Sequence, residues 1–569
     1  MKNLKSLAII NMKTLKYITT IIVVTTIFFF SCDEDQWLNE TPLDFYSPEN
    51  SYQTPAQFNS AVARLYGITN QYMMWGNTHT TKLLYDHTSD LAYDAIATTH
   101  ELNSYVDALT PQHRWIENVW DRYYDVIFNA NVILSRIDDV EFASEDQRER
   151  LKAEAMFFRA YMYRNLGIQF GGVPIVLEEI NEPKRDFTRA TREAVYEQAI
   201  SDLEFAAANL PHVSELTEDG RLTEAAANHL LSELYIIVND YDAAISAASS
   251  VIDDPSYALN IERFGVHQDW DGDVYWDLFR RGNQNRHGTG GFNPESIWVA
   301  QYEYLTPAGG QGNNNTRFVV PEYWRLSGSD GVPLFFGHSE KYGGRGIGWA
   351  TMTDYFFDLW EDPNDIRNSE HNILYDIEAD NPESAFYGQK IVESGAIDDH
   401  PNRLQRQWSA ILAKTAPLND FPPEVVDDPE TGATNNAANR TFRDHYYMRL
   451  AETYLLRAEA HLGNGNSALA AADINVVRER ANASPVTPGE VDIDYILDER
   501  ARELHLEDYR ILTLMRLGVL AERVREHDPM HNGKYASHGV SDHHNLWPIP
   551  QKEIERNTEA VLEQNPGYN

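Results

Sequence analysis

Hydrophobic residues recur at helical spacing in several long segments of the chain, and this pattern predicts a mainly α-helical protein. The first such segment follows a polar stretch with three prolines. There a helix is predicted to start near Pro55, to place Phe58, Val62 and Leu65 on one face, and to end at Gly67. Another helix is predicted to start near residue 115.

Three later segments, at residues 151–167, 223–255 and 449–481, share one design. Apolar residues return every three to four positions, and small residues stand where two helices would cross. In the second and third segments a short break, at 239–240 and at GNGN (463–466), separates two helices. A pair of about 34 residues is typical of tetratricopeptide-type hairpins. Such pairs cannot bury their apolar faces alone, so we expect them to stack.

Between residues 261 and 445 the helical spacing gives way to turns and short β-like runs. Sixteen of the 32 glycines and five of the 12 tryptophans fall in 261–350. Long loops mounted on a rigid scaffold are where binding residues concentrate. The pattern therefore predicts a tetratricopeptide-type helical-hairpin scaffold with a large irregular, partly β, loop-rich insertion. The parts are a helical region at 55–260, the insertion at 261–445 and a second helical region at 446–569.

The N-terminus reads as an export signal. Lys13 and Lys16 precede an apolar run of about 14 residues, which ends at Ser31 and the single cysteine, Cys32. This layout predicts a signal peptide at 1–31, a lipid-modified Cys32 and a polar tether at 33–54. The run is short for a bilayer span. The alternative is an uncleaved anchor with a buried, inert Cys32, and translation could start at Met1 or Met12.

The amino-acid composition limits the classes of partner that the protein is expected to bind. Without the four lysines of the signal, 43 basic and 87 acidic side chains remain, a formal net charge of −44. Such a surface repels nucleic acid and anionic membrane, so neither is an expected partner. With Cys32 used for lipid, no disulfide, thiolate nucleophile or cysteine zinc site is left.

Four segments in order resemble the SusD/RagB family of outer-membrane lipoproteins. They are EAMFFRAYMYRNLGIQFGGVPIV (154–176), YMRLAETYLLRAEAHLGNGN (447–466), ILDERARELHLEDYRILTLMRLG (496–518) and the ending LWPIPQKEIERNTEAVLEQNPGYN (546–569). The family usually has glycine where Asp508 stands. The resemblance covers nearly the whole mature chain.

The resemblance implies a glycan-binding protein that is lipid-anchored to the outer membrane and faces the cell exterior. It would serve a polysaccharide-utilisation system as a lid over a SusC-like TonB-dependent transporter. The acidic residues directly after Cys32 resemble the signal that sends such lipoproteins to the surface. The scaffold would face the transporter and the insertion would face the glycan.

A sugar presents an apolar C–H face and a rim of hydroxyls, so its site needs aromatic platforms beside planar polar groups. Two zones fit, and the family builds its glycan site from loops in these zones. The candidates are Tyr72, Trp75 and Asn77 in the first zone, and Trp270, Trp276, Tyr302, Tyr304, Asn313, Arg317 and Trp324 in the second. For each aromatic the alternative is core packing, which is favoured for Trp298 and evenly balanced for Trp75 and Trp276.

Two other functions stay open: an exported glycoside hydrolase or polysaccharide lyase, and a transporter-associated scaffold without a ligand of its own. No catalytic motif stands out, and no cofactor is expected, although the acidic turn WEDPNDIRN (360–368) could hold a structural calcium. The sequence does not name the glycan. Starch-like glucan, laminarin, ulvan and alginate are all candidates.

Overall fold

The computed structural model describes residues 51–73, 89–95, 103–307, 309–310, 312–398, 405–530 and 539–568. The chain divides into two units, Met1–Gln57 and Phe58–Asn569, and the fold described below is that of the second. The predicted signal peptide, Cys32 and residues 33–50 of the predicted tether lie outside the described residues. Within the described ranges, no helix has the length and apolar character needed to cross a membrane.

The scaffold is a series of helices in which most pack on the next one of the series, whereas α16 packs on α14. They are α6 (Arg114–Arg136), α7 (Glu145–Phe170), α8 (Arg192–Asn209), α9 (Glu224–Ile237), α10 (Tyr241–Ile252), α14 (Leu450–Gly463), α15 (Ser467–Arg480) and α16 (Ile493–Leu504). This confirms the mainly helical, hairpin-based architecture. The predicted breaks are also confirmed, since α9 and α10 flank residues 239–240 and α14 and α15 flank GNGN.

Local sequence explains where these helices begin. Ser144, Thr191, Asp240, Asn466 and Asp492 each accept a backbone N–H with the side chain at the start of α7, α8, α10, α15 and α16. Such caps satisfy donors that have no partner inside the helix.

One predicted boundary is wrong. Helix α3 (Pro55–Met73) continues through Gly67 for six more residues. A glycine inside a helix costs only about 1 kcal/mol relative to alanine. Burial of Ile68 and Met73, which are 6% and 0% exposed, outweighs that cost.

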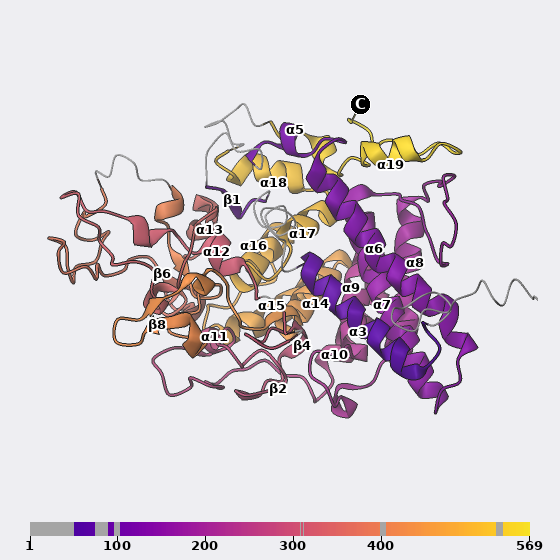
Figure 1. Ribbon diagram of the computed structural model, residues 1–569, viewed down its shortest axis with the longest axis horizontal. Coiled ribbons are helices and arrows are strands. Elements are labelled where there is room, and N and C mark those ends of the chain that lie inside the picture. The colour runs from indigo at the N-terminus through magenta and orange to yellow at the C-terminus, as the bar shows by residue number, and fades with distance from the viewer. Residues whose placement is uncertain are drawn as a thin grey trace, which may run out of the picture. The chain divides into compact units, whose positions relative to one another are not determined.

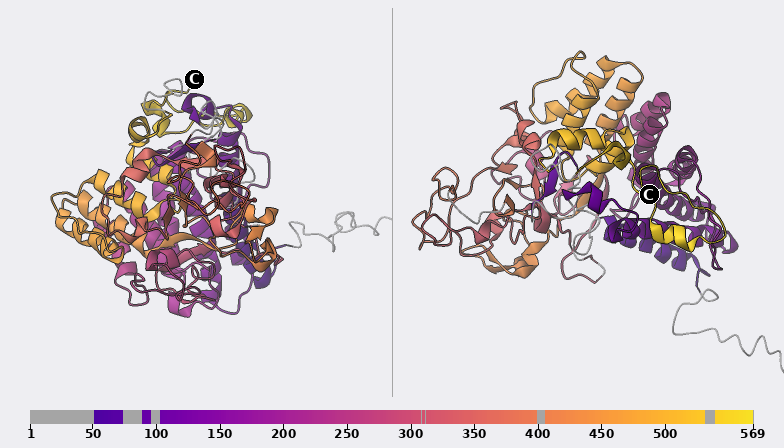
Figure 2. Two further views of the ribbon diagram at one scale, coloured as in Figure 1. Left: turned by 90° about the vertical axis from the view of Figure 1, so that its left-hand side faces the viewer. Right: turned by 90° about the horizontal axis from the view of Figure 1, so that it is seen from above.

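The two halves of the scaffold meet directly, although about 200 residues separate them in the chain. Helix α10 packs on α14, and His229 of α9 contacts the Thr453 hydroxyl of α14 at 2.8 Å. Small residues allow this approach: a Cβ on Gly463 would lie 2.4 Å from the Tyr241 ring. Figure 2 shows the orange α14–α15 pair beside the magenta α9–α10 pair in its right-hand view. The insertion therefore leaves and rejoins a continuous helical stack (Figure 1).

The insertion is built from short elements. The strands form two-stranded antiparallel pairs: β1 (Ala92–Asp94) with β5 (Ala350–Met352), β2 (His287–Gly288) with β3 (Gly291–Phe292), β4 (Ser296–Ala300) with β10 (His445–Arg449), β6 (Ile373–Leu374) with β7 (Ile411–Leu412), and β8 (Val426–Asp428) with β9 (Ala433–Thr434). The short helices are α11 (Val274–Asp277), α12 (Asn315–Val319) and α13 (Asp354–Asp358). A separate apolar core, which includes Tyr323, Phe335 and Ile411, holds these loops.

Strand β4 fastens the insertion to the scaffold through Trp298. Its indole is 1% exposed and stacks on Tyr447 of β10, with ring centroids 4.0 Å apart. Its edge also meets Phe157 and Tyr161 of α7. The expected core role of Trp298 is therefore confirmed.

The remaining helices complete the C-terminal part. They are α17 (Arg510–Leu517), α18 (Leu520–His527) and α19 (Gln551–Arg556), and α5 (Tyr105–Ala108) lies earlier in the chain. Arg510 of α17 and Arg523 of α18 both pair with the buried Asp90, at 2.7 and 3.2 Å. These ion pairs connect the segment before β1 to helices α17 and α18.

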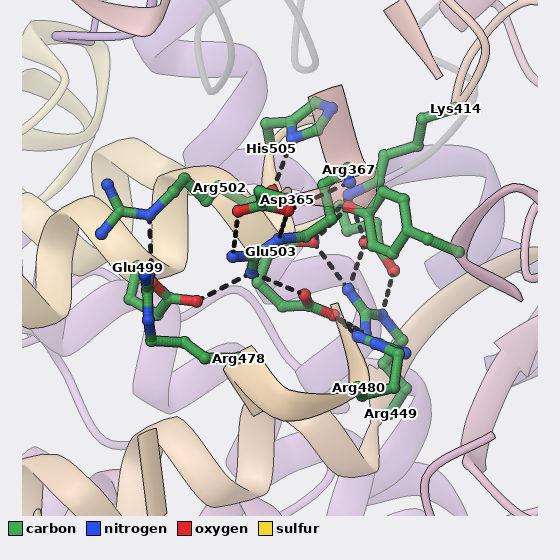
Figure 3. Close-up of polar contacts among 12 residues, drawn as sticks. Asp365, Arg367, Lys414, Arg449, Arg478, Arg480, Glu499, Arg502, Glu503 and His505 are labelled. Atoms are coloured by element: carbon green, nitrogen blue, oxygen red, sulfur yellow. Dashed lines mark hydrogen bonds and ion pairs between the residues drawn. The ribbon is translucent and has the colours of Figure 1, made fainter. Parts of the chain in front are cut away.

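A buried set of charged side chains joins the insertion to the C-terminal helices. We call it the Glu503 cluster. Its acids are Glu295, Asp365, Glu499, Glu503 and Glu507, and its bases are Arg367, Lys414, Arg449, Arg478, Arg480 and Arg502. Figure 3 shows most of these groups pointing toward one another.

Glu503 pairs with three arginines of this cluster. Its carboxylate pairs with Arg449 at 2.5 Å, with Arg367 at 3.0 Å and with Arg480, and it has no exposed side-chain surface. Burial alone would raise the pKa of Glu503, but the surrounding guanidinium groups outweigh it and hold this pKa below its usual range. The carboxylate therefore stays charged.

We expect Glu503→Gln to lower the free energy of unfolding by about 3–5 kcal/mol, because it leaves buried arginines without a compensating charge. Urea denaturation followed by circular dichroism measures this loss. The matched control is Glu479→Gln, at an exposed position on α15. A loss below about 1 kcal/mol, or an equal loss in both variants, would contradict the assignment.

Candidate functional site

A cavity of about 640 Å³ opens among the insertion loops. We call it the insertion cavity. Five stretches of the insertion and one scaffold residue line it: residues 266–267, 281–289, 301–304, 420–424 and 442–444, together with Asp219 from the loop before α9. Strand β2 carries His287 and Gly288 of this wall, and β4 and β8 adjoin the stretches 301–304 and 420–424 in the chain; all three strands are labelled in Figure 1.

Glycine allows one wall of the cavity to turn. Gly282 has φ +92°, and a Cβ there would lie 2.3 Å from the Thr289 hydroxyl. The left-handed conformation and the close approach both favour glycine. This turn brings Asn285 and His287 to the cavity wall.

Aromatic side chains form another part of the wall. Tyr304 is half-buried and packs its ring on Phe442, with centroids 4.3 Å apart. Trp270, which is 39% exposed, stacks on the ring of His267 at 3.8 Å and 26°. Tyr302 is 7% exposed, and its hydroxyl has no hydrogen-bond partner among the described residues.

Polar groups stand beside these rings. The backbone N–H of Tyr302 donates to Asp444 at 2.7 Å, and the Asn285 amide donates to the same carboxylate. Gln301 in turn donates to the Asn285 carbonyl oxygen at 2.9 Å. The chain of Gln301, Asn285 and Asp444 fixes the orientation of donors and acceptors along one wall.

Burial raises the pKa of Asp444 to about 7, and the nearby acids Glu303 and Asp219 act in the same direction. The two hydrogen bonds that the carboxylate accepts lower the pKa of Asp444 and only partly offset this increase. Near neutral pH the protonated and the ionised forms of the Asp444 side chain are therefore both present. The protonated form can donate a hydrogen bond, and both forms can accept one.

Asp420 organises the opposite wall. It is 5% exposed, and it accepts the backbone N–H of Arg281 at 2.6 Å and contacts His267 Nε2 at 3.4 Å. Burial alone would raise the pKa of Asp420, but these partners and Arg280 hold it below its usual value. His267 is thus fixed beneath Trp270.

The structure brings together three of the predicted site residues. Tyr302 and Tyr304 line the insertion cavity, and Trp270 stacks on its His267. These residues were found because aromatic side chains in a glycine-rich loop suggest binding. Asp444, Asn285 and Asp420 were missed, because only the fold brings single polar residues from distant loops together.

Four predicted residues lie elsewhere. Trp276 is 5% exposed and packs in the core of the insertion, with the Arg280 guanidinium 4.3 Å from its ring. Trp324 is half-buried against the same core and donates to the Gly346 carbonyl at 2.9 Å. Core packing therefore accounts for Trp276, and a ligand contact does not.

Asn313 and Arg317 make contacts within the insertion itself. Asn313 is fully buried and pairs through its backbone with Thr441. The Arg317 guanidinium lies over Trp349, 4.7 Å from the ring. Neither residue lines the insertion cavity.

The first predicted zone is only partly described. Tyr72 donates to the Asp125 carboxylate of α6 at 2.6 Å, and burial raises the pKa of Tyr72 to about 12. Trp75 and Asn77 lie outside the described residues.

Asp125 borders a second cavity, of about 510 Å³, between α6, the stretch 174–187 and α19. Two side-chain amides line this second cavity, and both already have hydrogen-bond partners. Asn131 is hydrogen-bonded to Val176 and Arg159, and Asn557 is hydrogen-bonded to Phe187. The insertion cavity, which gathers the predicted residues Tyr302 and Tyr304, is the better candidate for a sugar site.

One group of described side chains has the composition of a metal site: His212, Glu224 and Asp254. In the structure His212 Nδ1 accepts the Ser214 backbone N–H at 3.1 Å, and its Nε2 lies 2.8 Å from Asp254.

The carboxylates of the predicted calcium turn already accept hydrogen bonds or form ion pairs within the protein. Asp362 accepts the backbone N–H groups of Ser484 and Asn364, which lower its pKa to about 2, and Asp365 pairs with Arg367. The turn remains a predicted calcium site that no observation tests.

Comparison with known families now bears on this architecture. One family model, described as the SusD family, matches residues 416–568, and another, described as starch-binding and associating with the outer membrane, matches residues 41–236. Together they match more than half of the chain. The chain belongs to the SusD/RagB family.

Related sequences span the whole chain. A SusD-like protein, P25, of Formosa agariphila is 26% identical over 582 residues, covering 97% of this chain and 99% of that protein. The starch-binding protein SusD of Bacteroides thetaiotaomicron is 36% identical over 121 residues, 21% of each chain.

Solved structures of SusD-like proteins share the fold. A laminarin-binding SusD-like protein superposes with a TM-score of 0.65 at 24% identity, covering 91% of this chain and all of that one. Surface glycan-binding protein A of Bacteroides thetaiotaomicron, in complex with laminarihexaose, gives 0.64 at 20% identity, covering 90% of this chain and all of that one.

We expect the stability of this SusD/RagB protein to fall between about pH 4 and pH 7 through Asp444. A carboxyl whose pKa is higher in the folded state binds more protons when folded, so deprotonation across this interval favours unfolding. Asp444→Asn removes that contribution, of the order of 2–4 kcal/mol.

The measurement is the urea midpoint of both proteins from pH 4.5 to 8. The difference between wild type and Asp444→Asn should shift across the interval in favour of the variant, whatever the offset at pH 4.5. Glu383→Gln, at an exposed position of the insertion away from the cavity, serves as the control. A pH-independent difference would refute the buried, shifted carboxyl.

Proposed function

We propose that this SusD/RagB protein captures an oligosaccharide at the cell surface in the insertion cavity. The observation that carries the proposal is the cavity wall itself, where aromatic faces stand beside fixed donors and acceptors. The protein would be lipid-anchored through Cys32 to the outer membrane and would face the exterior.

Sugar chemistry fits the two kinds of wall. The ring of Tyr304 and the Trp270–His267 stack offer flat surfaces for the C–H face of a pyranose. Asn285 and Asp444 lie where ring hydroxyls would need partners. The names of related proteins mention starch and laminarin, which makes glucans the first ligands to test.

The captured glycan would pass to a SusC-like TonB-dependent transporter, for which this protein would act as a lid. A tethered lid needs only modest affinity, because the tether maintains a high local concentration of binding sites. A transporter-associated scaffold without its own ligand remains the alternative. It would co-purify with the transporter but bind no glycan.

We propose that the protein is not an enzyme. The family is a glycan-binding group, and the most strongly shifted carboxyl of the cavity, Asp444, is held by two hydrogen bonds within the wall. An exported hydrolase or lyase is the rival. Incubation with the bound glycan, followed by analysis of reducing ends and unsaturated sugars, decides between them, and release of either product would overturn the proposal.

Removal of an aromatic platform should weaken binding. We expect Tyr304→Ala and Trp270→Ala each to raise the Kd for the bound glycan about tenfold, equivalent to about 1.4 kcal/mol. Affinity electrophoresis through laminarin and soluble starch identifies the ligand, and calorimetry then gives the Kd.

Two controls isolate the stacking contribution. Tyr304→Phe keeps the ring and should bind nearly as wild type. Tyr387→Ala removes a 58% exposed tyrosine of the insertion that does not line the cavity. Equal losses in Tyr304→Ala and Tyr387→Ala would remove the insertion cavity as the glycan site.

The lipid anchor is tested in cells. We expect Cys32→Ala to abolish incorporation of labelled palmitate and to release the protein from the outer-membrane fraction. Palmitate incorporation into the variant equal to that of the wild type would contradict the anchor.

A further inference from the structure

Acidic side chains dominate the wall of the insertion cavity. Five carboxyl groups line it, whereas Arg281 is the single arginine or lysine among its described lining residues. The five acids are Asp219, Glu303, Asp420, Glu424 and Asp444.

The basic groups of this wall already face carboxylates. His287 Nδ1 lies 3.1 Å from Asp219, His267 Nε2 lies 3.4 Å from Asp420, and Arg281 Nε lies 3.8 Å from the same Asp420 oxygen. Their positive potential is therefore largely used within the wall. An anionic ligand would find no unpaired cation among these described residues.

Three of the acids have no such basic partner within the described residues: the buried Asp444, and Glu303 and Glu424. Glu303 and Glu424 are exposed, and no ion pair is formed by either within the described part of the chain. They lie on separate stretches, 301–304 and 420–424, that both line the cavity. In a cleft with low-dielectric walls, charges of one sign focus their field and repel ligands of the same sign.

We propose that the insertion cavity selects uncharged glycans, with Glu303 and Glu424 as specificity-determining residues that exclude uronate-bearing or sulfated chains. This inference rests on the proposed function and names the ligand class of the same site. Stacking on Tyr304 is blind to charge, so discrimination falls to the acidic side chains around it.

The experiment compares a glucan with its own charged derivative. Laminarin and carboxymethylated laminarin share a backbone and differ in added carboxylates, and soluble starch with carboxymethyl starch forms a second pair. Alginate and ulvan extend the anionic set. We expect the wild-type protein to bind a neutral member at least tenfold more tightly than its carboxymethyl derivative at low ionic strength.

The double variant Glu303→Gln with Glu424→Gln should raise affinity for the carboxymethyl derivative several-fold relative to affinity for the neutral glucan. The matched control is Glu383→Gln with Glu393→Gln. These two exposed glutamates of the insertion do not line the cavity, and their replacement changes the net charge equally. Sodium chloride at 0.5 M should reduce the wild-type discrimination, because salt screens exposed charges.

The outcomes separate the two levels of the argument. Binding of an anionic glycan as tightly as its neutral counterpart, with loss in Tyr304→Ala, overturns the charge selection and keeps the glycan site. Equal effects of the two double variants also overturn it, since net charge alone would then explain the preference. Absence of binding to every glycan, or binding insensitive to Tyr304→Ala, overturns the proposed site itself.

Discussion

Charge compensation inside the Glu503 cluster is the constraint on which the rest of the structure depends. Arg449 ends β10, Arg480 ends α15 and Arg367 lies in the insertion, yet all three converge on one buried carboxylate. A buried charge without its partner is costly, so these segments must meet in one arrangement. Hydrophobic packing brings the segments together, and this cluster fixes their register.

The site inherits its geometry from this joint. Strand β10 runs from His445 to Arg449, so the same short strand that ends in the cluster begins directly after Asp444 of the cavity wall. Its partner β4 ends at Ala300, directly before the stretch that carries Tyr302 and Tyr304. The β4–β10 pair thus links a rigid interior to a binding surface within a few residues.

The repeated helical hairpins of the fold could be predicted from the sequence. Helical spacing and small residues located the hairpins, because each hairpin is specified by local pattern. The Glu503 cluster could not be predicted in this way, because Glu499, Glu503 and Arg502 at helical spacing look like a solvated helix face. In the cavity, aromatic content suggested Trp270, Tyr302 and Tyr304 but also Trp276, since composition does not reveal which rings the fold covers.

The direct packing of α10 on α14 has a consequence for how this chain can change over time. Closing a flexible loop costs free energy that grows only with the logarithm of its length, so a tenfold longer insertion adds about 2 kcal/mol. Because α10 packs directly on α14, surface loops between Ile252 and Leu450 can change in length while this contact persists, provided that Glu295, Arg367 and Lys414 of the Glu503 cluster are kept. One scaffold can therefore present many different recognition surfaces.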